Sequence, residues 1–169
     1  LFHIQNASPD AWAGLEMNLR LAMQTLPDPA LAFVLRQHPL PATLLADANG
    51  QMKLGFLGVA SAQCFGDARQ PGLNFRLLFE VLERFDEEYT LWFHSSNLAT
   101  GEEFMLYDLA VANGATQLRP GEIVAAPVRL DMPPGEYDVA FGLWTPDRRR
   151  LYVDQANDIY WISLGRAGQ

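Results

Sequence analysis

Short stretches in which apolar and polar residues alternate, separated by turn residues, constrain the fold of this chain more than any other feature. The clearest stretch begins at Pro133-Pro134-Gly135 and runs to Trp144. Proline holds φ at about −65° and glycine accepts positive φ, so this turn sets the start of a strand. Four apolar residues then recur with the period of two that a half-buried strand shows: Tyr137, Val139, Phe141 and Leu143.

The same pattern recurs from residue 41 onward. Asn49-Gly50 is a hairpin signal, and Pro-Gly or Asn-Gly pairs separate many of the later stretches. Eight or nine strands are predicted, at 43–46, 53–59, 73–82, 88–95, 104–110, 122–130, 136–144, 149–154 and 159–164. Short strands without helices between them indicate a mostly β domain over residues 41–169. We predict an antiparallel β-sandwich of the immunoglobulin-like or jelly-roll-like kind.

Residues 1–40 have a different pattern, which predicts a helical segment. Ser8-Pro9-Asp10 combines an N-cap residue, a first-turn proline and an acid at the positive end of the helix dipole. Apolar residues follow at spacings of three and four: Trp12, Leu15, Leu19, Ala22 and Leu26. We expect this segment to pack on one outer face of the sandwich.

Charge and composition narrow the class of partner. The net charge of −8 argues against a nucleic acid or an anionic lipid surface. Cys64 is the single cysteine, which excludes an internal disulfide, and its apolar neighbours indicate a buried thiol. The chain begins at Leu1, so we expect a processed protein or a piece of a larger one.

Catalytic and metal-binding patterns are missing from the sequence. It contains neither a Gly-x-Ser-x-Gly motif nor a glycine-rich phosphate loop before a helix. Its three histidines have no partner at ligand spacing, and Asp86-Glu87-Glu88 is a run of neighbouring acids typical of a solvated turn. We therefore predict no catalytic residue, no metal and no cofactor.

Aromatic residues outside the predicted core are the remaining candidates for a site. Trp92 and Trp144 fall on faces opposite the core. Such side chains stack on the apolar faces of sugar rings. The predicted stacking residues are Trp92, Trp144, Trp161 and Tyr152, and the residues predicted to bind sugar hydroxyls are Asp147, Arg149 and Asn157.

A structural interpretation of the same face stays open. An amphipathic N-terminal helix needs an apolar surface to cover, and the face with Ala140, Gly142, Trp144 and Trp92 offers one. In that case the chain is a structural or protein-interaction module that docks on a membrane or enzyme partner through its helical segment.

From Leu54 onward the chain resembles the soluble C-terminal β-sandwich module of bacterial multi-pass membrane glycosyltransferases of the lipid-linked-sugar superfamily. The residues that carry this resemblance are 54–59, 73–82, 86–94, 119–124, 134–144 and 150–153. The end of the pattern is also similar to the carbohydrate-binding C-terminal domain of O-antigen ABC-transporter ATPases. Neither group places a catalytic residue on this chain.

Both resemblances imply an accessory, glycan-binding domain of a bacterial cell-envelope polysaccharide system. The first implies the extracytoplasmic or periplasmic face and a membrane-embedded portion of a larger protein. The second implies the cytoplasm and an ATPase portion. The expected ligand is a bacterial surface glycan in both cases.

Overall fold

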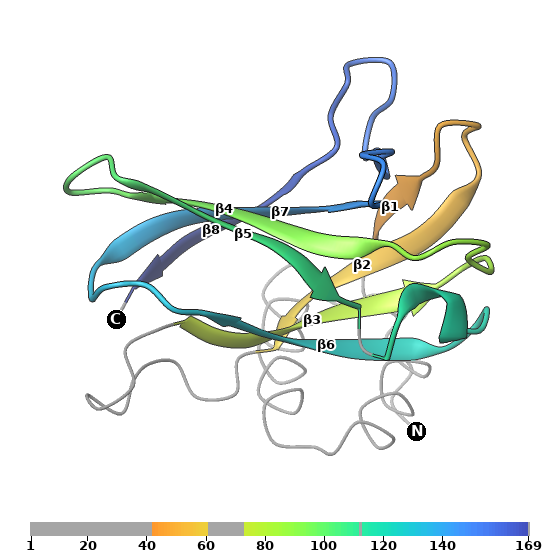
Figure 1. Ribbon diagram of the computed structural model, residues 1–169, viewed down its shortest axis with the longest axis horizontal. Helices are drawn as coiled ribbons and strands as arrows, with labels where there is room; N and C mark the ends of the chain where they lie inside the picture. Colours follow the sequence, from red (N-terminus) through yellow and green to blue (C-terminus); the bar gives the residue numbers. More distant parts are fainter. Residues whose placement is uncertain (1–41, 61–72, 112, 169) are drawn as a thin grey trace, which may run out of the picture.

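The computed structural model describes residues 42–60, 73–111 and 113–168, which form two facing four-stranded antiparallel sheets (Figure 1). The predicted antiparallel β-sandwich is confirmed. The first sheet has the order β1 (Thr43–Ala46), β2 (Met52–Ala60), β3 (Leu73–Val81), β6 (Ile123–Leu130). The second has the order β5 (Glu103–Ala110), β4 (Thr90–Asn97), β7 (Glu136–Trp144), β8 (Ile162–Gly168). A short 3-10 helix, η1 (Ala115–Gln117), connects β5 and β6.

The core lies between the sheets, on the faces that alternation predicts. The four predicted inward residues of β7 are each at most 1% exposed: Tyr137, Val139, Phe141 and Leu143. Phe141 makes edge contacts with the rings of Phe56 and Phe79 from the opposite sheet. Full burial of a large apolar side chain contributes about 2 kcal/mol before the entropy cost of ordering it. The core therefore holds the two sheets together through aromatic and aliphatic contacts.

A bulge in β2 keeps its apolar residues on the core side. Phe56 pairs with Phe79 and Gly58 pairs with Leu78, so Leu57 is skipped in the pairing. Gly58 has a φ of 140°, a backbone conformation that favours glycine. Because of this extra residue, Phe56 and Val59 both pack against the core although they are three positions apart.

The prediction of a strand at 149–154 is wrong. This segment makes only isolated bridges, and residue Tyr152 pairs with Ala46 of β1 in the other sheet. Two residues with positive φ, Arg148 and Asp158, interrupt the extended backbone on either side. The predicted strand at 159–164 also begins too early, since β8 starts at Ile162.

Several predictions fall on residues that the structure does not describe. The predicted helical segment at 1–40 and the predicted buried thiol of Cys64 lie outside the described residues, as do His3 and His38. Among the residues that are described, no helix has the length and apolar content that crossing a membrane requires.

Candidate functional site: an aromatic row on the outer face

Trp92 and Trp144 lie on the outer face of the second sheet, as alternation predicts. Their chain neighbours Leu91 and Leu143 point the other way and are fully buried. In the β4–β7 pairing, Trp92 faces Gly142 and Thr90 faces Trp144. The two tryptophans are therefore diagonal neighbours, and their ring centroids are 5.8 Å apart. Diagonal pairs on one sheet face are within reach of each other when the side chains are large.

A glycine makes room for the first of these rings. A Cβ at position 142 would lie 2.5 Å from Nε1 of Trp92 and 2.6 Å from the carbonyl oxygen of Tyr160. Nε1 of Trp92 is buried and has no hydrogen-bond partner among the described residues. The indole ring thus lies flat enough over β7 to cover the glycine that faces it.

A bulge in β5 adds a third ring to the face. Leu91 pairs with Leu109 and Phe93 pairs with Leu106, so Tyr107 and Asp108 together face the single residue Trp92. Asp108 has a φ of 62°, which turns the backbone at the bulge. As a result, consecutive side chains of β5 both reach the outer face. Figure 1 shows β5 at the edge of this sheet, beside β4.

The two bulge residues hold Trp144 in place. The ring of Tyr107 stacks on the ring of Trp144, with centroids 5.3 Å apart and planes 14° apart. Oδ1 of Asp108 accepts hydrogen bonds from Nε1 of Trp144 at 3.4 Å and from the hydroxyl of Thr90 at 3.3 Å. Neither residue was predicted from the sequence, because a bulge changes the face on which a side chain lies.

The segment before β8 extends the row at its other end. Tyr160 lies 6.0 Å from Trp92, centroid to centroid, and Trp161 meets Tyr160 edge-on at 5.1 Å. We define the aromatic row as the five rings in this chain of contacts: Tyr107, Trp144, Trp92, Tyr160 and Trp161. Its two end residues are the most accessible, since Tyr107 and Trp161 are each 44% exposed.

Two arginines lie over the row. Cζ of Arg148 is 3.9 Å from the centroid of Trp144, and Cζ of Arg150 is 3.8 Å from the centroid of Tyr160. A guanidinium that stacks on a ring keeps its N–H donors in its own plane, pointing sideways. Nη1 of Arg150 lies 4.0 Å from Oδ1 of Asp158 in this way. The row thus combines apolar ring faces with charged donors. In the sequence, these arginines belong to the run Arg148-Arg149-Arg150, which begins four positions after Trp144.

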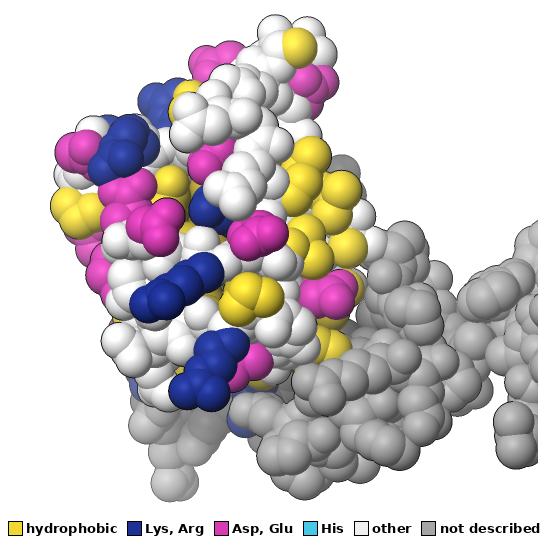
Figure 2. Space-filling view, turned by 90° about the vertical axis from the view of Figure 1, so that its right-hand side faces the viewer, with side chains coloured by type: hydrophobic (Ala, Val, Ile, Leu, Met, Phe, Trp, Pro, Cys, Tyr) yellow, Lys and Arg dark blue, Asp and Glu magenta, His cyan; other side chains and the backbone are white. Residues whose placement is uncertain are grey.

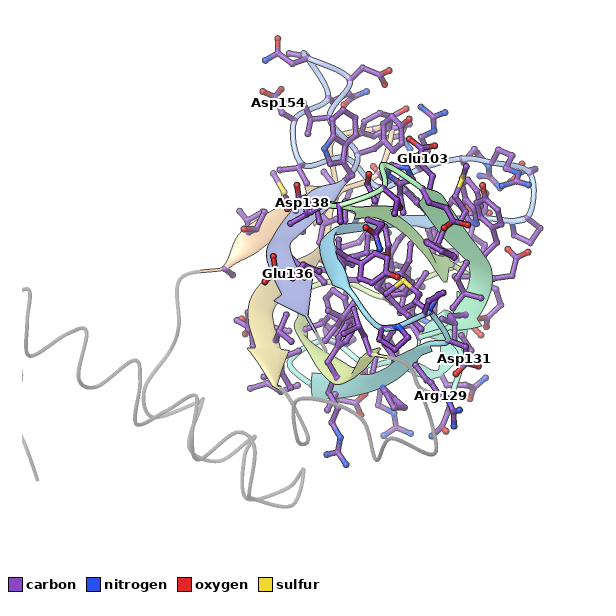
Figure 3. All side chains as sticks on the ribbon, turned by 90° about the vertical axis from the view of Figure 1, so that its left-hand side faces the viewer. Glu103, Arg129, Asp131, Glu136, Asp138 and Asp154 are labelled. Carbon is purple, nitrogen blue, oxygen red and sulfur yellow. The ribbon has the colours of Figure 1, made fainter. Side chains whose placement is uncertain are left out.

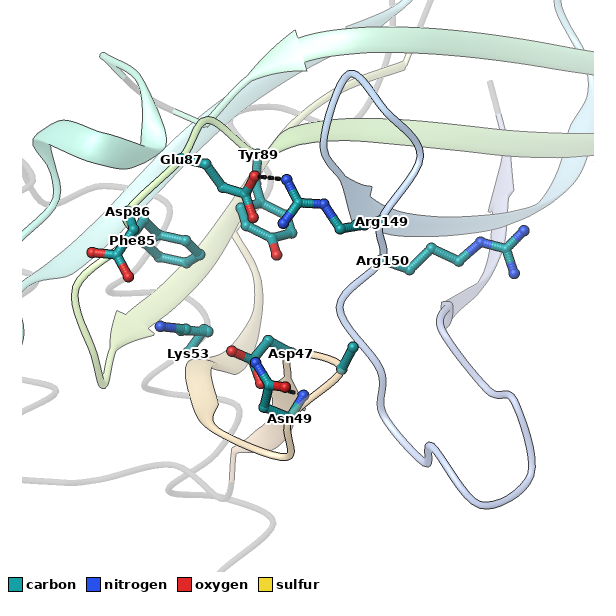
Figure 4. A pocket seen from close by; sticks show the side chains of 10 residues that line it. Asp47, Asn49, Lys53, Phe85, Asp86, Glu87, Tyr89, Arg149 and Arg150 are labelled. Carbon is teal, nitrogen blue, oxygen red and sulfur yellow. Dashed lines mark hydrogen bonds and ion pairs between the residues drawn. The ribbon is translucent and has the colours of Figure 1, made fainter.

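A pocket of about 530 Å³ lies beside the row, at one end of the sandwich (Figure 4). It is formed by the β1–β2 turn, the β3–β4 connection and the segment after β7. Figure 2 shows acidic and basic side chains interspersed over the end of the molecule that carries the first two of these segments. The lining residues are Asp47, Ala48, Asn49, Lys53, Phe85, Asp86, Glu87, Tyr89, Arg149 and Arg150.

Most charges in this pocket are already paired. Arg149 pairs with Glu87 across the pocket wall, and its Nε donates to Oδ2 of Asp147 at 2.9 Å. Asp47 accepts the backbone N–H groups of Asn49 and Gln51 in its own turn. Burial raises the pKa of the Tyr89 phenol to about 12, and the carboxylate of Glu87 adds to this shift. Tyr89 therefore stays neutral throughout the physiological range.

The structure brings together three of the predicted stacking residues but not the fourth. Trp92, Trp144 and Trp161 belong to the aromatic row. Tyr152 lies in the segment whose backbone pairs with Ala46 of β1, and the four ring contacts of the row do not include it.

The predicted hydroxyl-binding residues are engaged with neighbours in the chain. Asp147 accepts a hydrogen bond from Thr145 and one from Arg149, and these bonds lower the pKa of Asp147. The bond with Asp147 also raises the pKa of Arg149. Nδ2 of Asn157 donates to Asp154 at 2.7 Å in the loop that projects beyond the sheets, and this bond lowers the pKa of Asp154 (Figure 3).

Within the described part of the chain, no group of three or more His, Cys, Asp or Glu residues is placed to hold a metal ion. His94, on the same outer face, lies 3.5 Å from Glu103, and both side chains are exposed. No family model and no curated protein matches the chain.

Proposed function

We propose that this protein is a non-catalytic carbohydrate-binding module and that the aromatic row is its binding surface. The observation that carries the proposal is the unbroken sequence of ring contacts from Tyr107 to Trp161, with centroid steps between 5.1 and 6.0 Å. The axial C–H groups of a pyranose form an apolar face that packs on aromatic rings. A row of rings presents such contacts repeatedly, which favours a polysaccharide chain over a single sugar.

The arginines over the row supply the polar half of this recognition. Arg148 and Arg150 lie over Trp144 and Tyr160, respectively. Their in-plane N–H groups donate hydrogen bonds to hydroxyl or ring oxygens of a sugar beside them. In this proposal, Arg148 and Arg150 take over the hydroxyl-binding role that the sequence analysis assigned to Asp147, Arg149 and Asn157.

Titration calorimetry with bacterial surface polysaccharides tests the proposal. Trp161→Ala is expected to weaken binding at least about tenfold, because it removes an exposed stacking ring worth about 1.4 kcal/mol or more. Leu44→Ala is the matched control, since Leu44 is also 44% exposed but lies on β1 of the other sheet. Absence of binding to any such polysaccharide at millimolar concentration contradicts the proposal.

The resemblance described above supports a place in a bacterial cell-envelope polysaccharide system. In that setting the protein is an accessory domain attached to a glycosyltransferase or a transporter ATPase. A glycosyltransferase relationship would imply the extracytoplasmic face, and a transporter relationship would imply the cytoplasm. The sequence of the gene upstream of Leu1 separates the two, since it encodes membrane spans in one case and an ATPase domain in the other.

A structural or protein-interaction role is the second candidate, and the engagement of the inner rings favours it. Trp92 and Trp144 are half-buried, and the ring of Trp144 already contacts Tyr107 and Arg148. In this role the module docks on a membrane or enzyme partner through residues 1–40. Acrylamide quenching of tryptophan fluorescence distinguishes the carbohydrate-binding role from the interaction role. A carbohydrate surface requires a tryptophan that acrylamide can quench, and this quenchable fluorescence is expected to be lost in Trp161→Phe. A protein whose tryptophans all resist quenching has no such surface.

A further inference from the structure

β5 is an edge strand whose side chains are unusually accessible and apolar. Among the described strands it pairs with β4 on one side only and ends the sheet order. Met105 is 55% exposed, Leu106 36% and Tyr107 44%. An edge strand presents unpaired backbone N–H and C=O groups, and a hydrophobic one is a template for another strand. β5 therefore has both the backbone and the side chains of a pairing surface.

The two edges of the other sheet are protected, unlike β5. β6 carries Pro127, which has no N–H to offer a further strand, and β1 is only four residues long. In contrast, residues 103–107 contain neither proline nor a basic residue. Native edge strands are usually blocked by lysine, by proline or by a covering segment.

The sequence of β5 is self-complementary when two copies run antiparallel. If Met105 faces Met105 of a second copy, then Glu103 faces Tyr107 and Phe104 faces Leu106. Within residues 103–107 this register places no acid opposite another acid, and the first acid pair, Asp108 with Glu102, falls where the bulge ends the regular stretch. Apolar and aromatic cross-strand pairs stabilise such a ladder. The bulge at Asp108 ends the regular stretch immediately after Tyr107.

We propose that two copies of this chain associate through β5, antiparallel and about a two-fold axis. The pairing joins the second sheets of the two copies into one continuous sheet. Tyr107 lies in the paired segment, so the aromatic rows of both copies meet at the interface on the same outer face. A polymer bound across both rows gains affinity by multivalency. The association itself does not depend on what the rows bind.

Light scattering coupled to size-exclusion chromatography tests the proposal on the full chain, from micromolar to submillimolar concentration. The wild-type protein is expected to reach twice the chain mass of 18.9 kDa. Met105→Lys places a charge at the centre of the register and is expected to abolish the dimer. Met52→Lys is the matched control: Met52 is 44% exposed on β2, which has a neighbour on each side, and this variant is expected to remain dimeric.

Hydrogen exchange on the wild-type protein keeps the proposal testable if Met105→Lys fails to fold. Amide exchange in residues 104–107 is expected to slow as the protein concentration rises, while exchange at the β6 edge stays constant. A wild-type protein that stays monomeric over the whole range overturns the proposal. A folded Met105→Lys variant that still dimerises, or loss of the dimer in Met52→Lys, overturns it as well.

Discussion

The indole ring of Trp92 covers Gly142, its direct partner on the neighbouring strand, and occupies the space that any larger side chain at 142 needs. This pair lies at the middle of the aromatic row, where Trp92 contacts both Trp144 and Tyr160. The absence of one side chain on β7 therefore determines how close the rings from three different segments approach one another.

Gly142→Ala is expected to destabilise the protein by about 2 kcal/mol, which is the usual cost of overpacking a close contact. The new Cβ would lie 2.5 Å from Nε1 of Trp92 and 2.6 Å from a backbone carbonyl. Urea unfolding measures the loss. Gly55→Ala is the comparison, since its Cβ would lie 3.1 Å from that of Ala42, and a smaller loss is expected there.

A double-mutant cycle with Trp92→Leu separates the two causes of this loss. The part of the Gly142→Ala destabilisation that is absent in the Trp92→Leu background is caused by the contact with the indole ring. The part that remains is caused by the contact with the carbonyl of Tyr160. Equal losses in both backgrounds would show that the ring is not held against residue 142.

The pH dependence of stability is expected to change in Glu88→Gln. Glu88 accepts hydrogen bonds from the hydroxyl of Thr116 and from the N–H groups of Ala115 and Thr116. The bond from the Thr116 hydroxyl is the main reason that the pKa of Glu88 falls below its ordinary value of 4.5. The carboxylate therefore stabilises the fold above that value, and the contribution is lost as the pH falls through the lowered pKa.

Urea unfolding at a series of pH values checks this expectation. The wild-type protein is expected to be more stable than Glu88→Gln at neutral pH, with the difference shrinking below the ordinary carboxyl pKa. Glu83→Gln makes the same change at an exposed position of the same connection and serves as the control. A difference that grows on acidification would contradict the assignment.

Tyr137→Phe is expected to cost about 1 kcal/mol of unfolding free energy, the usual net value of one hydrogen bond. The ring of Tyr137 is fully buried, and its hydroxyl donates to the carbonyl of Pro133 at 2.8 Å. The bond fixes the turn that leads into β7. Tyr107→Phe, at an exposed position, is expected to change stability by less than about 0.5 kcal/mol. Equal effects of the two substitutions in thermal or urea unfolding would refute the structural role of the Tyr137 hydroxyl.

Lys53→Met is expected to raise the free energy of unfolding by about 1 kcal/mol. Lys53 is only 6% exposed, and its ammonium group donates to the carbonyl of Arg84 at 3.1 Å. No ion pair joins Lys53 to another of the described residues, and a buried charge without a close counter-ion carries a desolvation cost. Methionine keeps the length of the side chain without the charge. Arg119→Met removes an exposed cation and is expected to be neutral. If Lys53→Met instead lowers the free energy of unfolding measured in urea, the pocket compensates the desolvation cost of the ammonium group.

The faces of the strands were predictable because alternation is a local property. Each residue of β7 points opposite to its neighbour, so Tyr137 and Phe141 enter the core while Trp144 stays outside. The same rule placed Trp92 on the outer face of β4. These predictions required no knowledge of which strands are adjacent.

The composition of the site was less predictable, since it depends on where the backbone departs from alternation. Positive φ values at Asp108 and Arg148 place Tyr107, Asp108 and the Arg148 guanidinium around Trp144. Asp108 and Arg148 are not glycines, so the sequence lacks the usual marker of positive φ at these two positions. The strand predicted at 149–154 failed for a related reason, because its backbone pairs across to Ala46 of β1.

The sequence alone determined that two layers of antiparallel strands enclose an apolar core and that two tryptophans lie outside it, because side-chain alternation acts between chain neighbours. Only the tertiary structure decided which rings meet and which charges are already paired. Arg149 forms an ion pair with Glu87, which lies 62 residues earlier in the chain. Trp92 lies over Gly142 on β7, the neighbouring strand in the sheet. Such contacts follow from strand order and bulge position, which long-range packing selects.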